Sequence, residues 1–350
     1  MARQAFIVPA DLPGPSGGLT YNQRVLAHWR ASGLDVAEVA VPGGWPHPSP
    51  ADREMLAQRL AQHPQVLVDG IIGSAAPEEL AFAAAAGTQI AMLVHLPLPA
   101  ESGLSPEQRR RLAASECAAV NAAHTIVCTS GWAREDLQAR YGLDTATGAE
   151  PGGAPAGLAA GSMPPRALFL GALTPRKNPL GLLQTLTELP ELPWTAVIAG
   201  PEGQDPGYAG QVRAAAEALP EGRAAVIGAV GGSRLETLWG ETDLLVLPSL
   251  AETYGMVVTE ALARGIPALV GAGTGAQDAL RGDAQGPRAE LSAPGDALDP
   301  RDLHAWSATL RDFFSDASLR QQWRGAAQAH RARLRTWSHA AQDLRTAIEW

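Results

Sequence analysis

Residues 248–267 read PSLAETYGMVVTEALARGIP and follow the short apolar run of residues 243–247. The chain is therefore expected to leave a buried strand here, turn, and open a helix. Glu252 falls in the turn and Glu260 in the helix, with seven residues between them. Gly255, at the helix start, lets a ligand approach free backbone N–H groups, which favour an anion. Two carboxylates so placed could hold two parts of one polyol, although the spacing alone favours solvated surface residues.

On both sides of this stretch, short apolar runs alternate with helical patterns along almost the whole chain. Strands are predicted at residues 5–9, 36–41, 66–72, 90–96, 125–128, 167–170, 195–199, 224–227, 244–247 and 267–270. Helices are predicted at residues 19–32, 50–62, 77–86, 105–122, 132–140, 179–187, 208–219, 233–239, 255–264, 301–315, 317–333 and 337–348. Ser49, Ser105 and Ser130 have the chemistry of helix N-caps. This alternation predicts parallel sheets covered by helices on both faces.

The pattern stops once, at residues 142–165, which are rich in Gly, Ala, Pro and Thr and predict a linker. A length of 350 residues also predicts about two domains. Residues 271–299 form a second loop-rich stretch, with a short strand expected near Glu290. Ligands of doubly wound sheets bind outside the carboxyl ends of the strands, so the site is expected in an interdomain cleft. The expected parts are 1–150, 151–165 as the linker, 166–335 and 336–350.

The composition excludes several classes of protein. Hydrophobic residues make up 46% of the chain and charged residues 18%, which excludes a disordered or fibrous protein. The net charge of −9 argues against a nucleic-acid partner and against tight binding to an acidic membrane. The scarcity of cysteine, with only Cys117 and Cys128, indicates a reducing, cytoplasmic compartment. The most apolar window, residues 80–96, is too polar to span a bilayer, so no integral membrane segment is expected.

Lys177 is the only lysine among the 27 basic residues. The sparse Ile, Asn and Phe beside abundant Ala, Gly, Pro and Arg indicate a G+C-rich genome that replaces lysine codons. A lysine that survives this pressure marks a position where a compact ammonium serves and a planar guanidinium does not. Chance survival explains it equally well from the composition alone.

Five segments together carry a resemblance to a known family. They are SGGLTY at 16–21, AHTIVCTSGW at 123–132, LFLGALTPRKN at 168–178, LPWTAVIAGP at 192–201, and the stretch at 248–267. In this order they resemble the retaining GT-B glycosyltransferases, glycosyltransferase family 4 in particular. The resemblance implies two Rossmann-like α/β domains facing an interdomain cleft. The N-terminal domain would bind the acceptor, the C-terminal domain the nucleotide sugar, and the last helix would cross back to the N-terminal domain.

The same resemblance implies roles for residues of the C-terminal half. Glu260 would bind the ribose hydroxyls of a nucleotide sugar, and Glu252 would face the donor sugar as a catalytic residue. Lys177 would neutralise the diphosphate, which fits its being the only lysine. Tyr254 and Gly255 would complete the donor-binding loop.

Other implied site residues lie in both halves. Gly17 and Gly18 would let backbone N–H groups approach the phosphate or the sugar, or would form an ordinary turn before a helix. His95, at the end of a predicted strand, corresponds to the histidine that the family places beside the transferred sugar, although a lone histidine is more often a core residue. Family members carry an arginine where this chain has Ala172, and Arg176 could replace that charge.

The implied reaction is transfer of a sugar from a nucleotide diphosphate sugar to an unidentified acceptor hydroxyl, with retention of anomeric configuration. The chain contains no Asp-x-Asp sequence, which fits a metal-independent enzyme without a cofactor. A nucleotide-sugar epimerase and a non-catalytic nucleotide-sugar-binding protein remain alternatives.

Two further motifs have rival interpretations. Residues 271–276, GAGTGA, match a degenerate dinucleotide-binding fingerprint, but residues 278–287 predict a loop where that fingerprint needs a helix. The run Arg109–Arg111 could make peripheral contact with lipid phosphates. A solvated helix face, paired with Glu107 and Glu116, is the interpretation that we favour.

Overall fold

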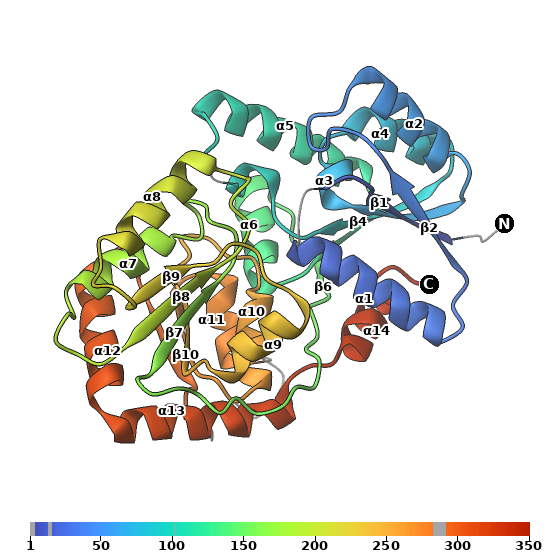
Figure 1. Ribbon diagram of the computed structural model, residues 1–350. Helices are drawn as coiled ribbons and strands as arrows, with labels where there is room; N and C mark the ends of the chain where they lie inside the picture. The colour runs from blue at the N-terminus through green and yellow to red at the C-terminus, as the bar shows by residue number, and fades with distance from the viewer. Residues whose placement is uncertain (1–3, 13–15, 102, 283–291) are drawn as a thin grey trace. The chain divides into compact units, whose positions relative to one another are not determined.

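The structure, a computed structural model, describes residues 4–12, 16–101, 103–282 and 292–350. Its contacts divide the chain into two units, Met1–Gly152 with Thr336–Trp350, and Gly153–Arg335. Each unit contains one six-stranded sheet, and the strand pairs are parallel, as predicted (Figure 1). None of the described helices is long and apolar enough to cross a membrane. The strand expected near Glu290 lies outside the described residues.

The first unit has the strand order β2-β1-β3-β4-β5-β6. Its elements are β1 (Gln4–Pro9), α1 (Gly17–Ala31), β2 (Val36–Val41), α2 (Pro50–Leu60), β3 (Gln65–Asp69), α3 (Gly70–Gly73), α4 (Pro77–Ala85), β4 (Gln89–Val94), η1 (Leu98–Ala100), α5 (Pro106–Ala122), β5 (Thr125–Cys128), α6 (Gly131–Tyr141), β6 (Thr147–Gly148) and α14 (Trp337–Ala347).

Local chemistry sets where these helices begin. Ser49 and Ser105 each accept a hydrogen bond from the third helical N–H, and each precedes a proline at the first position. Ser130 caps α6 in the same way, through the N–H of Ala133. The three predicted N-caps are confirmed.

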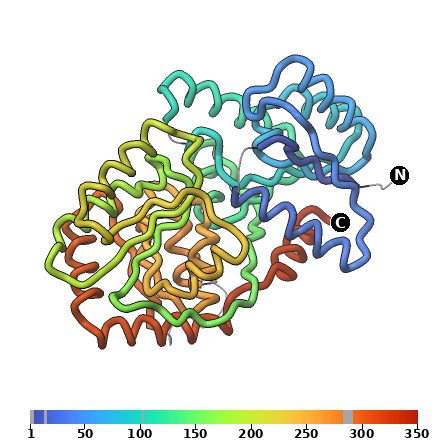
Figure 2. The backbone as a smooth tube through the Cα atoms, viewed as in Figure 1, coloured from blue at the N-terminus to red at the C-terminus, as the bar shows by residue number. Residues whose placement is uncertain are grey.

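The last helix, α14, belongs to the first unit although it ends the chain. Figure 2 shows the red C-terminal segment beside the blue helix α1. The indole N–H of Trp29 donates a 2.9 Å hydrogen bond to the carbonyl of Ala341. The rings of Tyr21 and Trp337 meet edge to face with their centroids 5.8 Å apart. These aromatic contacts hold the C-terminal segment on α1.

The second unit has the strand order β12-β11-β10-β7-β8-β9. Its elements are β7 (Arg166–Leu170), α7 (Pro179–Thr187), β8 (Thr195–Ala199), α8 (Pro206–Glu217), β9 (Ala224–Val226), α9 (Gly232–Gly240), β10 (Leu244–Leu247), α10 (Met256–Ala263), β11 (Ala268–Gly271), α11 (Gly275–Arg281), β12 (Gly295–Leu298), α12 (Leu303–Ser315), α13 (Ala317–His330) and η2 (Arg331–Arg333).

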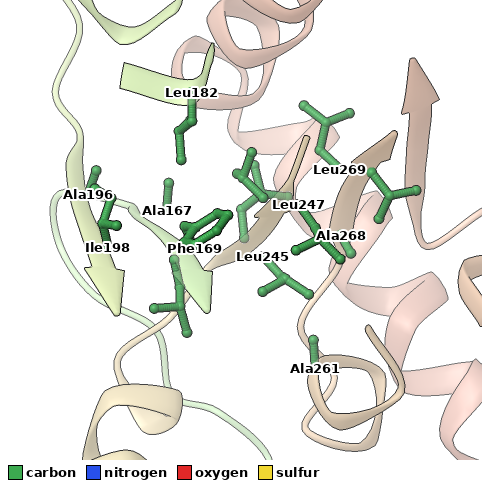
Figure 3. Close-up of a cluster of buried hydrophobic side chains, with 14 of the residues drawn as sticks. Ala167, Phe169, Leu182, Ala196, Ile198, Leu245, Leu247, Ala261, Ala268 and Leu269 are labelled. Atoms are coloured by element: carbon green, nitrogen blue, oxygen red, sulfur yellow. The ribbon is translucent and has the colours of Figure 1, made fainter. Parts of the chain in front are cut away.

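The core of the second unit lies between its sheet and the helices that cover it. Figure 3 shows Leu182 of α7 pointing toward Ala167 and Phe169 of β7. These three side chains are fully buried, as are Leu245 and Leu247 on the neighbouring strand β10. Burying a side chain such as Phe169 stabilises the fold by roughly 1.5–3 kcal/mol.

Three segments differ from their predicted structure. The strand expected at 66–72 ends at Asp69, and helix α3 starts at Gly70. A Cβ at Gly70 would lie 2.8 Å from the carbonyl of Leu93, so the two backbones approach too closely for a side chain. The loop-rich stretch 142–165 is not structureless at its start, because β6 (Thr147–Gly148) pairs with β5 in the first unit. Residues 278–281, which were expected in a loop, belong to helix α11 (Gly275–Arg281).

Candidate functional site

Strand order locates one candidate site in each unit. A doubly wound sheet binds ligands where its strand order reverses, at the carboxyl ends of the two strands on either side. In the second unit this point lies between β7 and β10, and in the first between β1 and β3. Lys177 follows β7 and Glu252 follows β10, whereas Asp69 ends β3.

Lys177 and Glu252 meet in the second unit. The ammonium of Lys177 donates a hydrogen bond to Oε2 of Glu252, and the two form an ion pair. The Lys177 side chain is 16% exposed and that of Glu252 10%, so the pair is largely removed from water. Ser249 Oγ donates a 3.5 Å hydrogen bond to the same carboxylate oxygen.

The charges around Glu252 decide its protonation. Burial alone would raise the pKa of this carboxyl, but the charges of Lys177 and Arg176, with hydrogen bonds from Lys177 and Ser249, outweigh burial and hold the pKa below its ordinary value. Glu252 is therefore an anion in the described structure. An anionic ligand arriving here would meet Lys177 already paired with this carboxylate.

Backbone and side-chain hydrogen bonds hold the two loops together. Arg176 Nη1 donates to the carbonyl of Ala251 at 3.1 Å, and the N–H of Leu250 donates to the carbonyl of Arg176 at 2.8 Å. Asn178 has a φ of +56° and caps α7, and its Nδ2 donates to the carbonyl of Pro248 at 3.2 Å. These hydrogen bonds hold the loop that carries Glu252 against the loop that carries Lys177, and Arg176 takes part in two of them.

The other predicted residues of this stretch lie around the start of α10. Gly255 has a φ of +78°, which favours glycine, and a Cβ there would lie 3.1 Å from Cα of Ala276. Tyr254 is buried in the hydrophobic core. Glu260 lies half-buried on α10, and Arg264 Nη1 donates to its backbone carbonyl at 3.0 Å.

The glycine-rich stretch 271–276 packs on the Glu252 loop. A Cβ at Gly271 would lie 2.3 Å from the carbonyl oxygen of Ser249, and one at Gly275 would lie 1.7 Å from that of Thr253. The N–H of Gly275 also donates to the backbone carbonyl of Glu252 at 2.7 Å. Close packing against backbone carbonyls therefore explains why residues 271 and 275 are glycines. The loop predicted from residue 278 was wrong for residues 278–281, which belong to helix α11 (Gly275–Arg281).

We expect the Gly275→Ala protein to be destabilised by more than 1 kcal/mol, because its new Cβ must displace a backbone carbonyl beside Glu252. Gly210→Ala is the matched control, since nothing lies within 4 Å of its Cβ position on α8 and alanine favours a helix. Thermal unfolding measures both. Equal melting temperatures for the two variants would contradict the close packing described here.

In the first unit, His95 meets two residues that the sequence analysis did not single out. Asn22 Nδ2 donates a 2.6 Å hydrogen bond to Oδ2 of Asp69, and Asn22 Oδ1 lies 3.0 Å from Nε2 of His95. His95 Nε2 lies 3.6 Å from Oδ2 of Asp69. Asn22 and Asp69 are buried, whereas the His95 side chain is 18% exposed.

Asp69 is held ionised in this cluster. Burial alone would raise the pKa of the Asp69 carboxyl, but His95, the N–H of Ile71 and Asn22 outweigh it, and the pKa lies below its ordinary value. The Ile71 N–H donates to Asp69 Oδ1 at 3.0 Å, which caps α3. A sequence signal did exist, because Asp-Gly at the end of an apolar run favours a turn.

Gly17 and Gly18 form the first turn of α1, capped by Ser16, rather than a turn before it. A Cβ at Gly18 would lie 3.0 Å from Cδ2 of His95. The missing side chain at Gly18 thus makes room for the imidazole ring. The edge-on ring of Tyr21, with its centroid 5.3 Å away, packs against the same imidazole.

The prediction for Glu116 was wrong. Glu116 is fully buried on α5 and accepts hydrogen bonds from Ser74, Leu98 N and Tyr141, so it does not pair with Arg109–Arg111 on a solvated face. Arg109 donates instead to the carbonyl of Pro99. Within the described residues, no group of three or more His, Cys, Asp or Glu side chains is arranged to hold a metal ion.

Two six-stranded parallel sheets, each with charged residues after the strands at its reversal point, define an α/β protein of two Rossmann-like units. Residues 155–330, half of the chain, match the family described as Glycosyl transferases group 1. The chain belongs to this family. The matched residues include Lys177, Glu252 and Glu260.

Named relatives match smaller parts of the chain. D-inositol 3-phosphate glycosyltransferase of Jonesia denitrificans is 29% identical over 191 residues, which are 52% of this chain and 42% of that protein. O-antigen chain mannosyltransferase B of Escherichia coli is 30% identical over 168 residues, 47% of this chain and 41% of that protein. The chain thus spans about two fifths of the length of these relatives.

Solved structures resemble the chain over nearly its full length. HepE of Anabaena, in complex with UDP and glucose, has a TM-score of 0.75 at 13% identity, covering 99% of both chains. Sucrose-phosphate synthase of Thermosynechococcus elongatus has a TM-score of 0.73 at 16% identity, covering 99% of this chain and 98% of that one. At such identities the likeness shows the fold, and the predicted GT-B fold is confirmed.

Proposed function

We propose that this chain transfers a sugar from a nucleotide diphosphate sugar to an acceptor hydroxyl, with retention of configuration and without a metal ion, as a family 4 enzyme. One observation carries the proposal: Lys177 and Glu252 are paired at the reversal point of a Rossmann-ordered sheet. Membership of a glycosyl transferase family supports it. The alternative of a nucleotide-sugar epimerase would need further acid and base groups in the first unit.

Each residue then has a role. Lys177 neutralises the diphosphate as a point charge, and the helix N–H groups after Gly255 add their dipoles. Glu252 faces the donor sugar and stabilises the positive charge that develops at its ring. Glu260 binds the ribose hydroxyls. Arg176 adds positive charge for the diphosphate, and Tyr254 and Gly255 complete the donor-binding loop. Gly17 and Gly18 let backbone N–H groups approach the phosphate or the sugar. His95, for which Gly18 makes room, contacts the sugar as the second catalytic residue.

The base, the sugar and the acceptor are open parts of this proposal. HepE was solved with UDP-glucose, and one relative is named a mannosyltransferase, so uridine and guanosine nucleotides are the first donors to try. The two unpaired cysteines, Cys117 and Cys128, support a reducing compartment such as the cytoplasm.

A thermal-shift panel with UDP, GDP, ADP, dTDP and NAD tests the proposal. A ligand at 100 times its Kd adds roughly 2.7 kcal/mol to the stability of the folded protein. We expect one nucleoside diphosphate to raise the melting temperature and the Lys177→Ala protein to lose that shift. NAD belongs in the panel because helix α11 follows the glycines of 271–276. A shift with NAD alone would overturn the proposal, and no shift at all would favour a different ligand.

A further inference from the structure

Hydrogen-bond chemistry determines which nitrogen of His95 carries hydrogen. The ionised carboxylate of Asp69 can only accept, so the group of Asn22 that faces it at 2.6 Å must be the NH₂. The carbonyl oxygen of Asn22 then faces Nε2 of His95 at 3.0 Å. A carbonyl oxygen only accepts, so Nε2 must be the N–H of the imidazole ring.

The opposite nitrogen of the ring is left with its lone pair. In the neutral imidazole, an N–H at Nε2 requires a bare Nδ1. Within the described chain, no hydrogen bond reaches Nδ1 of His95. The ring keeps its orientation because the backbone of Gly18 lies against Cδ2 and the Tyr21 ring packs edge-on.

We propose that Asn22 and Asp69 are positioning residues that lock His95 in its Nε2–H tautomer, so that Nδ1 accepts a hydrogen bond from a sugar hydroxyl. This inference rests on the proposed function for its ligand but not for its tautomer, which belongs to the protein without substrate. These hydrogen bonds run in one direction: the carboxylate of Asp69 fixes the orientation of the Asn22 amide, and that amide fixes the tautomer of His95.

The Asp69→Asn substitution should reverse the lock. A carboxamide at position 69 keeps one oxygen for the Ile71 N–H and turns its NH₂ toward Asn22. The amide of Asn22 must then rotate to present its oxygen to that NH₂, which places its own NH₂ against Nε2 of His95. Nε2 becomes an acceptor and Nδ1 becomes the N–H. The variant is thus nearly isosteric, but its Nδ1 presents an N–H to the sugar where the wild type presents a lone pair.

The double variant Asn22→Asp with Asp69→Asn should restore the lock. The carboxylate at position 22 accepts from the NH₂ at position 69 and, with its other oxygen, from Nε2–H of His95. The amide and the carboxylate have exchanged places, and the direction of the last hydrogen bond is again that of the wild type. A merely structural role for Asp69 gives no reason for the swap to recover the tautomer.

The experiment is nitrogen NMR on protein labelled with ¹⁵N-histidine, without substrate, using His95→Gln to assign the His95 signals. We expect Nε2–H in the wild type and the swap, and Nδ1–H in Asp69→Asn. Asp205→Asn is the control, since Asp205 also caps a helix, through the N–H of Tyr208 at 2.9 Å. That control should leave the His95 signals unchanged. Nδ1–H in the wild type, or an unchanged tautomer in Asp69→Asn, would overturn the lock.

Activity then tests the use of Nδ1. With a nucleotide sugar donor found by the panel, we expect kcat/KM for transfer to fall roughly 10²-fold in Asp69→Asn and to recover in the swap. Nucleotide binding should stay unchanged in both. If the tautomer switches while transfer is unaffected, the lock exists but Nδ1 does not act on substrate. If no nucleotide binds the wild type, the proposed function fails and the tautomer result still stands.

Discussion

The Glu252→Gln protein should bind a nucleoside diphosphate at least as tightly as the wild type and transfer sugar roughly 10²–10³-fold more slowly. The loss of rate follows because Glu252 is the anion proposed to stabilise positive charge on the donor sugar, and a carboxamide carries no charge. Binding of the diphosphate is retained because Lys177 and Arg176 are unchanged.

The ion pair between Lys177 and Glu252 also predicts the direction in which nucleotide binding changes. In the described structure Lys177 is paired with Glu252, so an arriving diphosphate competes with a carboxylate for the same ammonium. Replacing Glu252 with glutamine removes that competitor. The rise in melting temperature on adding the nucleotide should therefore be larger in the variant than in the wild type, at equal ligand concentration.

The pH dependence of stability has a defined sign. The pKa of Glu252 lies below its ordinary value in the folded protein, so its ionised form adds stability above the ordinary carboxyl range. That contribution is lost as the pH falls through the folded-state pKa. Without nucleotide, the Glu252→Gln protein should be less stable than the wild type at neutral pH, and the difference should shrink in acid.

Glu241→Gln is the matched control, because Glu241 forms an exposed ion pair with Arg166 and lies outside the proposed site. It should change neither transfer nor nucleotide binding, and stability by less than about 1 kcal/mol. Initial rates and thermal shifts on the three proteins provide the measurement. Transfer by Glu252→Gln at the wild-type rate would show that the site is assigned wrongly.

The alternation of strands and helices could be predicted from the sequence because buried parallel strands are short, continuous apolar runs. The strands Val36–Val41, Thr125–Cys128 and Thr195–Ala199 have the predicted bounds. Helix starts were predictable wherever a serine caps the helix, as at Ser49 and Ser105. These features depend on neighbours in the chain, which the sequence displays directly.

Features that depend on backbone contacts between residues far apart in the sequence could not be predicted. The strand ends at Asp69 because Gly70 packs on the carbonyl of Leu93, a contact made across the sheet. The glycines at 271 and 275 looked like a phosphate-binding fingerprint, but they pack on the carbonyls of Ser249 and Thr253. No local pattern separates these two uses of glycine.

In two cases the signal was present and was not used. Glu116 lies on the same helical stripe as Leu112, Ala119 and Val120, and all four are buried. Asn22 shares a stripe with Val25 and Trp29 in the same way. A polar residue on an apolar stripe must find hydrogen-bond partners inside the protein, so its position alone indicates a structural or functional network.

Glu116→Leu should unfold the first unit at a markedly lower temperature than the wild type. Glu116 accepts from Ser74 Oγ at 3.0 Å, Leu98 N at 3.0 Å and Tyr141 OH at 2.8 Å, and it is fully buried. Leucine leaves these donors without an acceptor, which costs roughly 3 kcal/mol. For a unit of this size that corresponds to about 6–12 °C in melting temperature.

Glu116→Gln should cost less than about 1 kcal/mol, because its oxygen still accepts from Ser74 and Leu98. The Tyr141 hydroxyl can turn to accept from the new NH₂. Glu107→Leu and Glu107→Gln are controls on the exposed start of the same helix. Both should change the melting temperature by only a few degrees, since Glu107 is solvated.

The pH dependence of stability distinguishes a buried carboxyl at position 116 from a buried amide. Burial raises the pKa of Glu116 above its ordinary value, more than the hydrogen bonds from Leu98, Tyr141 and Ser74 lower it. The folded protein therefore binds this proton more tightly than the unfolded chain, and stability is gained as the pH falls through the folded-state pKa. Between neutral and mildly acidic pH, the free energy of unfolding of the wild type should rise relative to that of Glu116→Gln, as measured by denaturant titration. A pH-independent difference, or a leucine variant as stable as the glutamine variant, would contradict the buried network, because only a solvated Glu116 could be replaced so freely.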